Sequence, residues 1–134
     1  MIVAPYRLSM ALGTFGNVPE DAGLEAVDEL LETLTRIDEL WLRFHPETPA
    51  LYEAGVRYRF ERDDRWVDWP VLLAEKWADC EDLAAARASE LRAAGVDATA
   101  KARLERASPG DVLYHAIVLT PWGIEDPSAE LGMR

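Results

Sequence analysis

The chain has 134 residues and a single cysteine, Cys80. This length suits one domain, 1–134, with enough apolar residues for a core, and one cysteine cannot form an internal disulfide. The formal net charge is −11. A surface that acidic repels phosphate backbones and anionic lipids, which argues against nucleic acids and membranes as partners.

The N-terminal segment is expected to be part of the fold rather than a targeting signal. Residues 1–7 lack a basic region followed by a long apolar run, so we expect no secretory signal. Residues 6–12 alternate apolar and polar side chains, which predicts a half-buried strand that ends at Gly13. Asn17, with Glu20 three positions later, is typical of a helix start.

Residues 20–44 carry the strongest helical period. Apolar side chains recur every three or four residues with charged ones mostly between them, which predicts an amphipathic helix on a core. The helix should end at His45-Pro46, because a residue before proline disfavours helical geometry. We interpret His45 as a helix-end residue. The expected core face consists of Leu24, Val27, Leu31, Leu34, Ile37, Trp41 and Phe44.

The middle of the chain is rich in turns and tryptophan. Residues 56–60 alternate again, which indicates a short strand or an extended arm. Trp66, Trp69 and Trp77 gather around Pro70. These tryptophans are expected either to pack in the core and line the wall of a groove, or to contact the substrate.

The C-terminal half predicts a helix followed by an antiparallel meander. Residues 80–94 are rich in helix formers, with Asp79 placed as N-cap and Gly95 just past the end. One helix feeding such a meander is an α+β order. The expected strands are 98–106, 111–121 and a third strand or exit loop at 124–128.

Three residues of this half form a candidate catalytic triad. Cys80 lies in the first helical turn, where unpaired N–H groups and the helix dipole favour a thiolate, although Glu81 beside it opposes this. His115 lies in mid-strand and is the natural base. Asp126 follows eleven residues later, so a hairpin would bring its carboxylate back to one ring nitrogen, with the sulfur facing the other.

These residues resemble the transglutaminase-like superfamily, in which a cysteine at a helix N-terminus is followed by a histidine on the next strands and then an aspartate. The resemblance rests on the runs 77–83, 90–96, 114–118 and 125–128. It looks most like bacterial transglutaminase-like cysteine proteinases and small relatives encoded by bacteriophages. It covers 55–134 as a catalytic-type core, with 1–54 as an N-terminal helical extension. Ala78 and Ala116 depart from the family pattern.

The resemblance implies a papain-like fold, with the nucleophile helix packed on a small antiparallel sheet, and a thiol hydrolase of the cysteine protease or amidase type. Cys80 would be the nucleophile, His115 the general base and acid, and Asp126 the residue that orients the imidazole. The backbone N–H of Cys80 is the default oxyanion donor. The implied partner is a peptide or protein substrate, in a bacterial or phage-infected cytoplasm or on a virion, and no cofactor is required.

Two other functions stay open at this point. One is a non-catalytic phage structural or assembly protein that uses the fold for binding. The other is a leader peptidase of the lasso-peptide type, which shares the Cys-His-Asp order.

Acidic residues beside the nucleophile suggest a cation. Asp79, Glu81 and Asp82 are candidate calcium ligands, since calcium favours clustered carboxylates. Some related proteinases depend on calcium, and Asp79 and Glu81 match the positions implicated there. One cysteine and two histidines do not make a common structural zinc set, and the chain has no glycine-rich phosphate loop.

Overall fold

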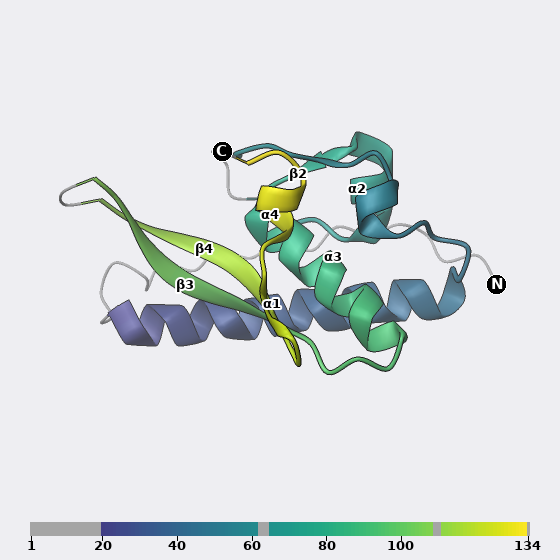
Figure 1. Ribbon diagram of the computed structural model, residues 1–134, viewed down its shortest axis with the longest axis horizontal. Coiled ribbons are helices and arrows are strands. Elements are labelled where there is room, and N and C mark those ends of the chain that lie inside the picture. Colours follow the sequence, from purple (N-terminus) through teal and green to yellow (C-terminus); the bar gives the residue numbers. More distant parts are fainter. Residues whose placement is uncertain (1–19, 62–64, 109–110, 134) are drawn as a thin grey trace.

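The computed structural model describes residues 20–61, 65–108 and 111–133. The strand expected at 6–12 and the helix-start signal before Glu20 lie outside these residues. Along the chain (Figure 1), the elements are α1 (Glu20–Phe44), η2 (Leu51–Glu53), β1 (Arg57–Tyr58), α2 (Trp69–Glu75), β2 (Trp77–Ala78), α3 (Cys80–Ala93), β3 (Thr99–Ser108), β4 (Asp111–Thr120), β5 (Gly123–Glu125) and α4 (Pro127–Glu130).

The expected α+β class is confirmed. β3, β4 and β5 form an antiparallel sheet in sequence order, and its first hairpin pairs Ala102 with Ala116. β1 and β2 form a separate parallel pair, with Arg57 opposite Trp77, which the sequence did not indicate. No helix in the described ranges is both long and apolar enough to cross a membrane.

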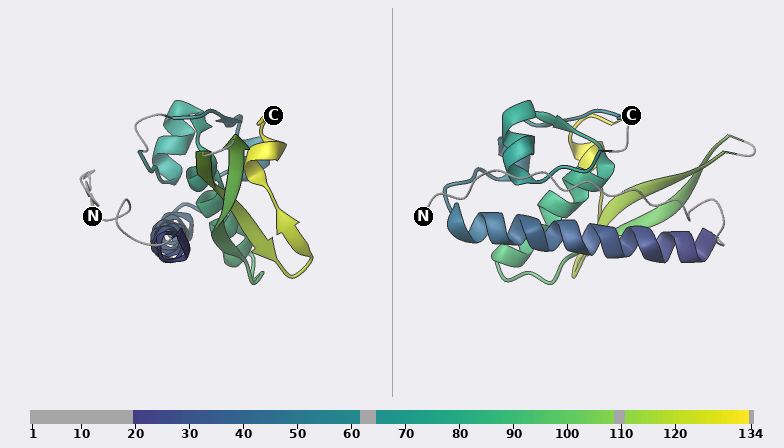
Figure 2. Two further views of the ribbon diagram at one scale, coloured as in Figure 1. Left: turned by 90° about the vertical axis from the view of Figure 1, so that its left-hand side faces the viewer. Right: turned by 180° about the vertical axis from the view of Figure 1, so that it is seen from behind.

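α3 lies at the centre of the molecule. Its many alanines let neighbouring elements approach closely, so α1 and the sheet both pack on it (Figure 2). Leu83 and Ala86 join a core cluster that includes Trp69 and Leu72. The opposite side of α3 joins a second cluster with α1 and the sheet, formed by Leu31, Ala84, Ala88, Ala98, Ala100, Ala102, Ala116 and Val118.

α1 follows its sequence pattern only in part. It ends at Phe44, and His45 stacks on Trp41 with ring centroids 3.5 Å apart. Leu31 and Leu34 are buried as expected, but Ile37 is 37% and Phe44 is 72% exposed. The prediction that these last two side chains belong to the core face is therefore wrong, because α3 and the sheet cover a narrower stripe than the apolar pattern offers.

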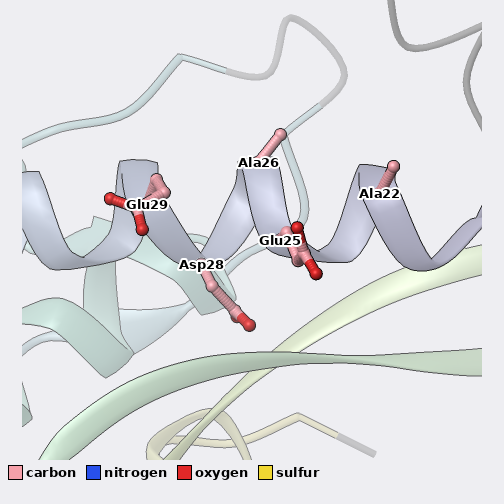
Figure 3. Close-up of a pocket in the computed structure, with 5 residues that line it drawn as sticks. All are labelled: Ala22, Glu25, Ala26, Asp28 and Glu29. Atoms are coloured by element: carbon pink, nitrogen blue, oxygen red, sulfur yellow. The ribbon is translucent and has the colours of Figure 1, made fainter.

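Polar contacts fix α1 against the sheet and α3. Asp28 points toward β3 (Figure 3), where its Oδ1 accepts the N–H of Ala102 at 2.8 Å. Arg92 on α3 forms ion pairs with Glu32 and Glu39 at 2.8 and 3.0 Å. These contacts determine how the long helix lies across the core.

Candidate functional site

The start of α3 is held by a reciprocal cap around Asp79. The Oδ1 atom of Asp79 accepts the N–H of Cys80 at 2.7 Å, and its Oδ2 accepts the N–H of Glu61 at 3.0 Å. Asp82, three residues on, accepts the N–H of Asp79 at 3.3 Å and that of Val67 at 2.7 Å. The Asp-Cys-Glu-Asp run is therefore a capping box that also ties two preceding segments to the helix N-terminus.

Cys80 is half-buried at this N-terminus, and its thiol donates to Oε2 of Glu81 at 3.4 Å. Burial raises the pKa of the Cys80 thiol, and the Glu81 carboxylate raises it further. The backbone N–H of Ala116, directed at the sulfur, lowers the same pKa but does not reverse the balance. Burial and Glu81 therefore oppose the thiolate that the helix N-terminus is expected to favour.

His115 and Asp126 form a direct pair. β5 places Glu125 opposite Val118, so the next residue lies beside β4. Oδ2 of Asp126 is 2.8 Å from Nε2 of the buried His115. Asp126 also caps α4, where its Oδ1 accepts the N–H of Ala129 at 3.4 Å. This second bond fixes the carboxylate, and the carboxylate in turn orients the imidazole.

The structure brings two residues of the predicted triad, His115 and Asp126, into direct contact. The sulfur of Cys80 faces Ala116, the residue after His115, and Asp126 holds the far nitrogen of the imidazole. Nδ1 is therefore the ring nitrogen that remains for proton exchange. Within the described ranges, however, the thiol hydrogen bond goes to Glu81 and not to His115.

An ion pair further along α3 supports this geometry. Nε of Arg87 lies 2.7 Å from Oε2 of Glu125, the residue before Asp126. The same guanidinium contacts Glu90 at 2.7 Å. A bidentate, partly buried arginine of this kind ties β5 to α3.

Tyr58 is a further candidate for the site that the sequence did not indicate. β1 places it opposite Ala78, two residues before Cys80. Burial, followed by the charges of Asp79 and Cys80, raises the pKa of Tyr58 to about 12, and Asp126 adds to the effect. The phenol therefore lies within electrostatic range of these groups and stays protonated at neutral pH. The alternation of residues 56–60 was the available signal, but it did not show which strand would pair with this one.

The three tryptophans separate into different environments. Trp69 is fully buried, and its indole N–H donates to Ser89 at 2.9 Å. It is therefore a core residue, and the expected contact with substrate does not apply to it. Trp66 is half-buried against the second core cluster. Trp77 is half-buried, with the guanidinium groups of Arg59 and Arg65 4.6 and 5.7 Å from its ring centroid.

Asp79, Cys80 and Glu81 could together hold a cation, since one ligand atom from each lies within 4.8 Å of the others. They fit calcium poorly, because calcium takes 6–8 oxygen ligands, one donor here is sulfur, and both Asp79 oxygens accept backbone N–H groups. Asp82, the third predicted ligand, is engaged by two backbone donors. Its pKa is raised by burial and by Glu81, which weakens it as a ligand.

Comparison of the chain with protein-family models, with curated proteins and with solved structures found no match.

Proposed function

We propose that the protein is a thiol hydrolase of the transglutaminase-like type that cleaves an amide bond. Cys80 would attack the carbonyl carbon while its proton passes to Nδ1 of His115, and the imidazolium would then protonate the leaving amine. Water would release the acyl group from the sulfur in a second step, with His115 as base. Asp126 would hold the imidazole orientation and stabilise its charge.

The contact between His115 and Asp126 carries this proposal. A buried strand histidine has one nitrogen 2.8 Å from a carboxylate, and the residue after it faces the sulfur of a cysteine at a helix N-terminus. These are the parts of a nucleophile, a base and an orienting group. The raised pKa of Cys80 makes His115 a necessary base, since a preformed thiolate is disfavoured. Proton transfer and attack would then be coupled, and reactivity should rise with pH rather than be complete at pH 6.

The oxyanion donor is expected to differ from the default. The backbone N–H of Cys80 already donates to Asp79 at 2.7 Å, which leaves it poorly placed to bind an oxyanion. We propose the Tyr58 phenol as the donor, because β1 pairs it with Ala78, two residues before Cys80, and its raised pKa keeps it protonated.

A second candidate is a non-catalytic binding or assembly domain. The observation that favours it is the resting state of Cys80, whose thiol bonds to Glu81 and whose pKa is raised. A cysteine retained for packing would have the same properties.

One experiment separates these two functions. Native protein is incubated with a panel of peptidyl electrophiles that acylate or alkylate thiols, and Cys80 labelling is followed by intact mass. His115→Ala should slow labelling by at least ~10²-fold, the usual contribution of a general base. His45→Ala is the matched control, because His45 is the other histidine of the chain and binds Trp41 instead. Labelling that needs denaturant, or that His115→Ala leaves unchanged, supports the binding domain.

A further inference from the structure

α1 carries an apolar seam that the core does not use. We define the seam as Ala26, Leu30, Thr33, Ile37, Leu40 and Phe44. Successive seam residues are separated alternately by four and three positions. An average spacing of 3.5 residues is the heptad repeat by which two helices pack side by side. Leu40 is 50% and Phe44 is 72% exposed, so the C-terminal half of the seam lies on the surface of the described structure.

The seam faces away from the contacts that hold α1 to the rest of the molecule. Asp28 points toward β3, whereas Ala26 points to the other side of the helix (Figure 3). The end-on view shows α3 and the sheet on one side of α1 (Figure 2). At 3.6 residues per turn the seam is centred roughly 140° around the helix from the buried side chains Leu31, Thr35 and Asp38.

Two unmatched charges flank the seam on one side. Glu29 and Arg43 are exposed, and neither forms an ion pair within the part of the chain that the structure describes. They are separated by fourteen residues, or two heptads, and so occupy equivalent positions along the helix. Arg36 lies midway between them, and its charge is offset by Glu32 at 3.3 Å.

We propose that two copies of this chain associate through the seam as an antiparallel helix pair, with a twofold axis near residues 35–36. That axis puts Leu30 against Leu40 of the second copy and Ala26 against its Phe44. It also puts Glu29 opposite Arg43 of the second copy, twice by symmetry. The seam is centred on residue 35 and the charge pair on residue 36, so one axis serves both. In a parallel pair, equivalent flanking positions of the two helices lie on opposite sides of the interface, so Glu29 and Arg43 would not meet.

The association should be weak. The seam from Ala26 to Phe44 is ~27 Å long at 1.5 Å per residue. A single pair of helices in contact over this length buries less surface than the ~1,200–2,000 Å² of a standard protein interface. We therefore expect dissociation in the micromolar range. This inference is independent of the proposed hydrolase function, because no seam residue belongs to the site.

Sedimentation equilibrium of the full chain from ~1 to ~200 μM tests the proposal. The mass should rise from 15.0 kDa toward twice that value. Leu40→Glu should raise the dissociation constant at least tenfold, and so should Arg43→Glu. The double variant Glu29→Arg with Arg43→Glu should recover the wild-type constant within about threefold, since it exchanges the two charges. Ile124→Glu is the matched control, because Ile124 is 64% exposed on β5, away from the seam.

Three results would overturn the proposal. The first is a monomer at the highest concentration, together with a lower melting temperature for Leu40→Glu, which would indicate that another part of the same chain covers the seam. The second is a dimer that Ile124→Glu disrupts and Leu40→Glu does not. The third is a double charge exchange that stays as weak as the single variants, which would rule out the antiparallel arrangement.

Discussion

Glu81 should control the reactivity of Cys80. Its Oε2 accepts from the thiol at 3.4 Å, and its charge raises the pKa of that thiol. Glu81→Gln keeps the size of the side chain and removes the charge. The variant should therefore contain more thiolate at neutral pH and react faster with iodoacetamide.

The size of the effect follows from the distance. Between a thiolate and a carboxylate 3.4 Å apart, Coulomb's law gives ~1.2 kcal/mol at the dielectric constant of water and ~5 kcal/mol at an effective value near 20. Removing the charge raises the thiolate fraction between ~8-fold and ~4,000-fold. A less basic thiolate is also a weaker nucleophile, with a Brønsted coefficient of ~0.5, so the rate gain is ~3-fold to ~60-fold. We expect a value near the middle, about tenfold, because Cys80 is only half-buried.

The assay is the second-order rate constant of alkylation at pH 7, followed by intact mass on native protein. Glu53→Gln, a change at an exposed position on η2, is the control and should leave the rate unchanged. Equal melting temperatures for the variants would show that labelling does not proceed through unfolding. A rate that stays equal or falls in Glu81→Gln would mean that burial alone determines the pKa, and the electrostatic argument would be wrong.

Three further predictions concern Asp126, the buried Asp38 and calcium. Asp126→Asn should slow labelling of Cys80 by a peptidyl electrophile at least ~10²-fold yet preserve the melting temperature, because asparagine still caps α4; equal rates would remove Asp126 from the triad. Burial raises the pKa of Asp38 well above its usual value, so wild-type stability should fall as pH rises from about 4 toward that raised pKa. Asp38→Asn should remove this contribution, and urea unfolding at several pH values should show the difference between the variants growing by up to ~1.4 kcal/mol per pH unit; a constant difference would contradict it. Millimolar calcium should leave the melting temperature unchanged, whereas a rise that Glu81→Gln abolishes would establish a cation site.

Local features of the chain could be predicted from sequence because they depend on neighbouring residues. The end of α1 before Pro46 and the span of α3 from Cys80 follow from proline geometry and helix capping. Gly95 ends α3 with a positive φ of 84°, which glycine adopts without strain. The approach of Asp126 to His115 was also predictable, since a tight hairpin returns the chain within a few residues.

Only the tertiary structure decided the features that join distant segments. The β1–β2 pair links Arg57 to Trp77 through two residues on each strand, too short a pattern to find in sequence, and it delivers Tyr58 to the site. The same holds for the covered stripe of α1, because a helical period shows that a face is apolar but not how much of it a partner covers. The state of Cys80 was undecided for a related reason. The helix dipole is a local property that favours the thiolate. Burial and the orientation of Glu81 depend on how α3 packs against β4, and in the folded protein both raise the pKa of the thiol.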